Sequence, residues 1–215
     1  MKRSFLILGW IALCLGALYA GSLNPVQIAE DGRNDVKRKL EAYEKGNATL
    51  EETTRSTGPE WSHKVVAYYQ ARTNDISTKQ KLPIGRCYAF IGEFPQAARL
   101  AQEYVNVYSN DWHGWRVLGS ANLGLKSFEN AINAYTNAVR LGDEESLTGL
   151  GFAALALKRR DLLLTIVVPR LLTRKDDRQT SERDKLDMVA ILVTYSLQTN
   201  QKDIFVRALE RVESK

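Results

Sequence analysis

Apolar and small residues recur at three- and four-residue steps along the middle of the chain, and the pattern itself returns with a longer, constant period. The corresponding positions are Gly85 and Gly119, Phe94 and Phe128, and Ala97 and Ala131. A further step of the same length brings Ala153, Ala156 and Leu162 into the same frame. Such spacing places side chains on one face of a helix, so the sequence predicts an internal repeat of amphipathic helices.

The stretch 112–145 predicts one pair of helices in detail. Asp111 stands where a side-chain oxygen can cap the first helix, and 126–127 is a short break before the second. The apolar face of the first helix carries Trp115, Leu118, Gly119 and Asn122. That of the second carries Phe128, Ala131, Ala134, Tyr135 and Ala138. The small residues allow two antiparallel helices to approach closely, while the aromatic rings fill the remaining space.

The series from Trp115 to Ala138, together with the length of the period, resembles the tetratricopeptide repeat (TPR) family. The resemblance implies an all-α fold, an α-solenoid of three to four antiparallel helix pairs. The units would be about 78–111, 112–145, 146–179 and 185–215. Pro83 should shorten the opening helix of the first unit, and Pro169 should kink or break the second helix of the third. The last unit reads as a degenerate or capping pair after a polar loop.

Residues 24–77 predict an extension that packs on the first repeat. The spacing of Val36, Leu40 and Tyr43 indicates a helix over 28–45, and the polar stretch 46–59 reads as a loop. Apolar residues from Trp61 to Ala71 predict another helix, which would cover the exposed end of the stack.

The segment 1–23 is predicted to engage a membrane. Lys2 and Arg3 are followed by residues 4–23, which carry no charge. As a retained signal-anchor these residues form a helix long enough to span the membrane, with the N-terminus cytoplasmic and 24–215 on the periplasmic or luminal side. As a secretory signal they would be cleaved near Ser22. A lipoprotein signal at Cys14 is disfavoured, because Leu13 stands where a small residue is expected.

Charge and cysteine content narrow the class of protein. The formal net charge is +5, with 30 basic and 25 acidic residues spread along the chain, and Lys2 and Arg3 belong to the leader. This weak, dispersed charge argues against nucleic-acid binding. Outside the leader Cys87 is the single cysteine, so no intramolecular disulfide is expected, and its apolar neighbours predict a buried thiol.

The sequence offers no recognisable catalytic or metal site. His63 and His113 lie far apart, and no phosphate-binding glycine loop or nucleophile elbow is present. We therefore expect a protein that is not an enzyme and needs no cofactor, with an enzyme whose site is unrecognised as the alternative from another class.

By resemblance to the TPR family, the opening helices line a groove for a peptide. The residues implied there are Lys79, Arg86, Ala89, Phe90, His113, Arg116, Ser120, Leu123, Leu150, Ala154 and Leu157. Arg86 and Arg116 could jointly bind a carboxylate of the partner. The functional expectation is a protein–protein interaction scaffold, a membrane-anchored accessory subunit whose partners are other subunits of a membrane-protein complex. The alternative is a soluble secreted adaptor for envelope or cofactor-protein assembly.

Overall fold

The computed structural model describes residues 25–54, 58–173 and 182–213, and every regular element over these ranges is a helix. The predicted all-α class is therefore confirmed for the described part of the chain. No helix in these ranges is both long and apolar enough to cross a membrane. The membrane-engaging segment predicted at 4–23 lies outside the described residues.

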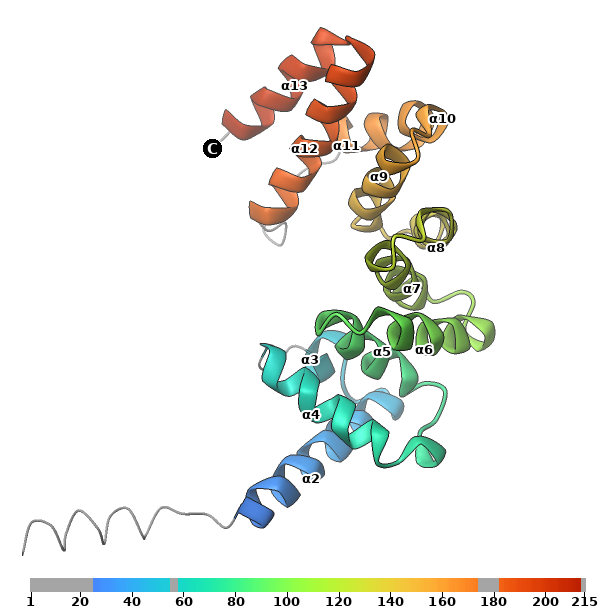
Figure 1. Cartoon of the computed structure of the whole chain (residues 1–215), viewed down its shortest axis with the longest axis vertical. Coiled ribbons are helices and arrows are strands. Elements are labelled where there is room, and N and C mark those ends of the chain that lie inside the picture. Colours follow the sequence, from blue (N-terminus) through green and yellow to red (C-terminus); the bar gives the residue numbers. More distant parts are fainter. Residues whose placement is uncertain (1–24, 55–57, 174–181, 214–215) are drawn as a thin grey trace, which may run out of the picture.

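The helices follow one another with short connections (Figure 1). They are α2 (Pro25–Glu44), α3 (Leu50–Thr54), α4 (Gly58–Gln70), α5 (Lys81–Phe90), α6 (Phe94–Val107), α7 (Trp112–Gly124), α8 (Phe128–Arg140), α9 (Ser146–Ala156), α10 (Arg160–Leu162), α11 (Val168–Thr173), α12 (Glu182–Thr199) and α13 (Lys202–Glu213). A 3₁₀ turn, η1 (Thr73–Asp75), precedes α5, and a π-helical segment, η2 (Leu163–Val167), lies between α10 and α11.

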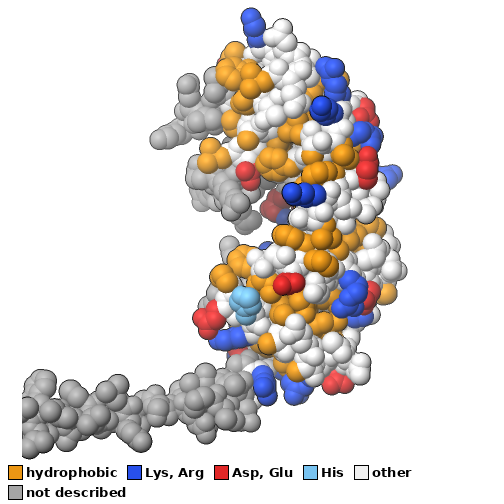
Figure 2. All heavy atoms as spheres, viewed as in Figure 1, with side chains coloured by type: hydrophobic (Ala, Val, Ile, Leu, Met, Phe, Trp, Pro, Cys, Tyr) orange, Lys and Arg blue, Asp and Glu red, His pale blue; other side chains and the backbone are white. Residues whose placement is uncertain are grey.

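Successive helices form antiparallel pairs that stack into a curved array. The pairs are α5 with α6, α7 with α8, α9 with α10–η2–α11, and α12 with α13, and each packs on the next. Figure 1 shows the opening helices α5, α7, α9 and α12 along one side of the curve and α6, α8 and α10 along the other. The space-filling view in Figure 2 shows a hollow on one side of the curve. The array thus has an inner side formed by opening helices and an outer side formed by closing helices.

Tyr135 of α8 joins three helices of this array. Its ring is 4% exposed and lies against Gly119 of α7 and Gly149 of α9. A Cβ added to Gly119 would lie 2.7 Å from Tyr135 Cδ1, and one added to Gly149 would lie closer still to the same ring. The hydroxyl of Tyr135 is 3.1 Å from Ser120 Oγ. The helices can approach this closely because both glycines lack a side chain.

The third opening helix follows a different register from the predicted one. The Leu118-Gly119 pair of α7 corresponds to Leu150-Gly151 of α9, so this step is two positions shorter than the step from Gly85 to Gly119. The predicted frame is therefore wrong by two positions in α9. The physical reason is burial: Leu150 and Ala154 have no exposed surface, because they belong to the core that α9 forms with α8, η2, α11 and α12. They cannot line a groove.

The third unit bends where Pro169 was expected to interrupt it. Pro169 lies in α11, directly after the π-helical segment η2. Proline donates no backbone hydrogen bond and its ring crowds the preceding turn, so the regular α-helical pattern is lost there. The segment still covers the core, because Leu163, Val167 and Leu171 are buried. The predicted kink or break is thus confirmed as an irregular helix that stays packed.

The extension before the repeats contains more helix than predicted. The stretch 46–59 was expected to be a loop, yet it contains α3 and the start of α4. Thr49 and Glu52 form a capping box: Glu52 N–H donates to Thr49 Oγ1 at 3.1 Å, and Thr49 N–H donates to Glu52 Oε2 at 2.7 Å. The indole N–H of Trp61 then donates to Thr53 O at 3.0 Å, which holds α3 against α4.

We expect the Gly119→Ala variant to be less stable than the wild type by about 1–3 kcal/mol in free energy of unfolding, because the methyl group meets the wedged Tyr135 ring. The matched control is Gly85→Ala. Gly85 is the equivalent residue of the first unit, where the nearest atom, Leu100 Cβ, is 3.4 Å from the added carbon. This variant should be neutral or slightly stabilised, because alanine favours the helix. Urea denaturation of both variants checks the prediction, and equal stabilities would contradict it.

Candidate protein-binding surface

The inner side of the first unit combines a structural lysine with an exposed aromatic ring. Lys79, predicted to face the groove, donates its ammonium N–H to Glu44 O at 2.8 Å and lies over the Tyr43 ring. It therefore ties the end of α2 to the start of α5. Phe90, at the end of α5, is 62% exposed, while Arg86 and Ala89 are partly buried. Of these predicted residues, Phe90 offers the largest exposed apolar side chain.

The start of α7 carries a compact polar cluster around Asp111. Its carboxylate caps the helix by accepting the His113 backbone N–H at 3.0 Å, which confirms the predicted N-cap. The His113 ring nitrogen Nδ1 lies 2.7 Å from the same oxygen, and the imidazole stacks on Trp112 with ring centroids 3.5 Å apart. His113 is thus held in a fixed orientation at the edge of the inner side.

The pKa values around Asp111 follow from these contacts. Burial alone would raise the pKa of the carboxyl group, but hydrogen bonds from His113 and from the Tyr104 hydroxyl outweigh it and hold the pKa below its usual value. Tyr104 O–H donates to Asp111 Oδ2 at 2.5 Å. Burial and this bond raise the pKa of the Tyr104 hydroxyl, so it stays protonated and keeps donating.

Arg116 is committed to contacts within the chain. Its Nε lies 3.4 Å from the buried Asp143 carboxylate, its terminal nitrogen pairs with Glu145, and its guanidinium lies over the Trp112 ring at 4.4 Å from the centroid. Asp143 also accepts the Ser146 hydroxyl at 2.6 Å. Arg116 therefore fastens α7 to the turn that enters α9. These contacts within the chain conflict with the hypothesis that Arg116 joins Arg86 in binding a carboxylate of another protein.

The rest of the inner side becomes apolar toward α9. Ser120 and Leu123 of α7, which were predicted to line the groove, are partly buried. With the shorter step into α9, the positions of Arg116, Ser120 and Leu123 correspond to Thr148, Phe152 and Leu155. All three are partly exposed, so they replace the predicted Leu150 and Ala154 on this face. Leu157 is partly exposed just after α9.

We use the term inner surface for Phe90, Ser120, Leu123, Thr148, Phe152 and Leu155. The sequence prediction missed Thr148, Phe152 and Leu155. The repeated Leu-Gly pair at 118–119 and 150–151 was the available signal, because it marks the buried face of each opening helix.

The described part of the inner surface contains no cluster of metal-binding side chains. No three His, Cys, Asp or Glu side chains come together in a way that could hold a metal ion within the described ranges. His63 lies exposed on α4, and His113 belongs to the Asp111 cluster. Cys87 is 2% exposed, which confirms the predicted burial. Burial raises the pKa of its thiol to about 11, so the reactive thiolate is scarce near neutral pH.

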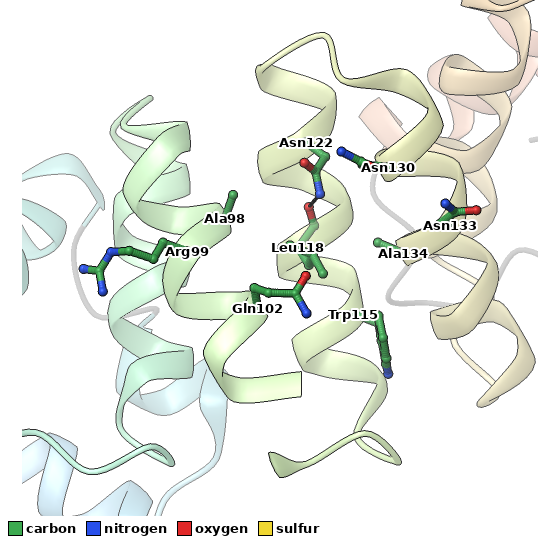
Figure 3. Close-up of a pocket in the computed structure, with 9 residues that line it drawn as sticks. All are labelled: Ala98, Arg99, Gln102, Trp115, Leu118, Asn122, Asn130, Asn133 and Ala134. Atoms are coloured by element: carbon green, nitrogen blue, oxygen red, sulfur yellow. Dashed lines mark hydrogen bonds between the residues drawn. The ribbon is translucent and has the colours of Figure 1, made fainter. Parts of the chain in front are cut away.

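A second concavity lies on the outer side of the array, between α6, α7 and α8 (Figure 3). It encloses about 460 Å³ and is open to solvent. Its lining comes from Ala98, Arg99 and Gln102 of α6, from Trp115, Leu118 and Asn122 of α7, and from Asn130, Asn133 and Ala134 of α8. We call this concavity the outer pocket. It was not predicted from the sequence.

Comparison with solved structures finds the same kind of array. One crystal structure of MamA matches with a TM-score of 0.57 and 17% identity, over 77% of this chain and 96% of that chain. The fold is similar to that of MamA. A second crystal structure of MamA gives 0.53 and 18% over 86% and 94%, and the MamA MSR-1 C2 structure gives 0.52 and 14% over 82% and 94%. At these identities the likeness concerns the fold alone.

Comparison by sequence adds no relative. No family model matches the chain, and the search of curated proteins finds no match.

The Asp111 cluster predicts a pH-dependent stability. Because the folded pKa of Asp111 is depressed, its contribution is present above the unfolded pKa of about 4 and is lost as the pH falls through the folded value. We expect Asp111→Asn to cost about 1.5 kcal/mol near pH 7, and the difference from wild type to shrink between about pH 5 and 3. Denaturation at several pH values measures it. Tyr104→Phe should retain part of the pH dependence, and a difference that stays constant with pH would contradict the assignment.

Proposed function

We propose that this chain is a non-catalytic protein–protein interaction scaffold that binds another polypeptide on its inner surface. The observation that supports this most directly is that the opening helices α5, α7 and α9 each carry exposed or partly exposed side chains of the inner surface. These helices lie along one side of the curve (Figure 1). Phe90, Phe152 and Leu155 supply apolar area there, and Ser120 supplies a hydroxyl. The similarity to MamA supports the helical array that carries this row, and no more.

The chemistry of the inner surface favours a partner segment with apolar side chains. Its charged groups are largely satisfied within the chain, since Lys79 bonds to α2 and Arg116 pairs with Asp143 and Glu145. Binding energy would therefore come from burial of Phe90, Phe152 and Leu155, as when an amphipathic helix or extended segment lies in a groove.

The proposed setting is a membrane. Residues 4–23 would anchor the chain, place 24–215 on the periplasmic or luminal side and bring the scaffold beside other subunits of a membrane-protein complex. The support is the uncharged stretch that follows Lys2 and Arg3. The alternative proposal is a soluble secreted adaptor for envelope or cofactor-protein assembly, released by cleavage near Ser22.

Phe90→Ser should weaken binding to a partner captured by crosslinking in mild detergent by about tenfold, because a large apolar contact is lost. Val107→Ser is the matched control: Val107 is 61% exposed, close to the 62% of Phe90, but ends the closing helix α6. Affinity of the purified pair would be measured for both variants. An unchanged affinity for Phe90→Ser, or an equal loss for Val107→Ser, would remove the inner surface as the binding site.

N-terminal sequencing of the native protein tests the anchor. The proposal expects the chain extracted by detergent to begin at or near Met1, because an anchor is retained. A native N-terminus at Ser22 or Leu23 would instead establish cleavage and support the secreted adaptor.

A further inference from the structure

The outer pocket lies where asparagine occupies the position that tyrosine fills in the first unit. Tyr88 of α5 and Asn122 of α7 hold equivalent places one repeat apart, since each follows its Ile-Gly or Leu-Gly pair at the same spacing. Tyr88 is 3% exposed. Its ring packs edge-on against Tyr69 of α4, with centroids 6.1 Å apart and planes at 89°. Two aromatic rings thus fill the space between α4, α5 and α6.

The next interval of the array lacks both rings. Asn122 is shorter than tyrosine, and the space between α6, α7 and α8 remains open as the outer pocket. At its side Trp115 takes the place of Lys81, which in the first unit pairs with Glu103 at 2.7 Å. The first unit therefore closes its own interval with aromatic rings and an ion pair, whereas the second leaves a cavity with an indole at its edge.

The groups around the outer pocket are amides and apolar atoms. In Figure 3, Gln102 points from α6 toward α7, and Asn130 points from α8 toward Asn122. Gln102 Nε2–H donates to Asn106 at 2.8 Å and Asn130 Nδ2–H donates to Ser127 at 2.9 Å, so each amide keeps its carbonyl oxygen and a second N–H for a ligand. The Asn122 side chain is fixed by its Nδ2–H bond to Leu118 O at 3.0 Å. A side-chain amide both donates and accepts, which matches the peptide group of another chain and disfavours a fixed charge.

Arg99, the one charged residue of the lining, is turned away from the outer pocket (Figure 3). Its guanidinium donates to Glu103 at 2.7 Å and to the Tyr69 hydroxyl at 3.1 Å. The lining that faces the cavity is therefore neutral, so a partner's acidic or basic side chain would lose hydration there without gaining an opposite charge.

We propose that the outer pocket binds an aromatic side chain from an extended, uncharged segment of another polypeptide. The ring takes the place that Tyr88 fills in the first unit, packed between Trp115 and Leu118. The peptide groups on either side of it bond to the carbonyl oxygens and the second N–H groups of the Gln102 and Asn130 amides. This site is formed by α7 and the closing helices α6 and α8, and it shares no residue with the inner surface, so it does not depend on the function proposed for that surface.

The test uses the full chain in detergent micelles with ¹⁵N-labelled tryptophan, and the probe is the blocked peptide acetyl-Ser-Gly-Gly-Tyr-Gly-Gly-Ser-amide. At millimolar concentration it should shift the indole signal of Trp115 and leave that of the buried Trp61 in place. The same peptide with alanine in place of tyrosine should leave the Trp115 signal unchanged. Phe90→Ser, on the inner surface, should keep the full response.

Asn122→Tyr should abolish the peptide-induced shift of the Trp115 signal, because the new ring fills the outer pocket as Tyr88 fills the space between α4, α5 and α6. Asn74→Tyr, at an exposed site in η1, is the matched control and should respond like the wild type. Asn130 is exposed, so Asn130→Leu tests the site without touching the core even if Asn122→Tyr fails to fold. It should weaken the response roughly fivefold, as expected for one lost hydrogen bond.

Three results would each overturn the proposal. The first is an unshifted Trp115 signal with the tyrosine peptide. The second is a Trp115 shift with the alanine peptide as large as with the tyrosine peptide, or a shift in folded Asn122→Tyr or Asn130→Leu protein as large as in the wild type. The third is a Trp115 shift that follows protein concentration without peptide, since it would make a second copy of this chain the occupant.

Discussion

The close packing of Tyr135 against two glycines is the contact on which the middle of the array depends. Its ring lies between Gly119 of α7 and Gly149 of α9, so one side chain of α8 sets the separation of two successive opening helices. Protein cores adopt such packing because dispersion contacts are lost rapidly when neighbouring surfaces separate. The hydroxyl beside Ser120 gives the buried ring a polar partner.

This spacing determines which side chains can act as a surface. With α7 and α9 held by Tyr135, Arg116 reaches Asp143 and Glu145 and becomes part of the scaffold. Phe152 and Leu155 are then left partly exposed on the inner side. On the outer side Tyr88 fills the interval of the first unit, and the outer pocket lies in the next interval, where Asn122 takes its place.

The helix pairs were predictable because they depend on local patterns, but the register and the outer pocket were not. Asp111 indicated the start of α7, and Pro169 indicated an irregular helix. The prediction assumed that the repeat length stays constant up to α9. The connection between two helices can, however, be two residues shorter while the Leu-Gly pair stays on the buried face. The Thr49–Glu52 capping box lies in a polar stretch without an apolar helical pattern, so the polarity indicated a loop although the two residues form a helix start. The outer pocket depends on how the side chains of α6, α7 and α8 meet in the fold. The residue pattern of any one helix does not show that a space remains between them.

Thiol labelling tests the central claim, that Phe152 faces the inner side while Leu150 completes the core. Phe152→Cys and Leu150→Cys would be compared in a Cys14→Ala background, where the remaining Cys87 is buried. We expect N-ethylmaleimide to modify the cysteine at 152 in the folded protein, because this position is partly exposed. The cysteine at 150 should react at least about 100-fold more slowly, because the reagent must wait for local opening. Equal rates in two proteins with the same helical circular dichroism would contradict the register, and with it the inner surface.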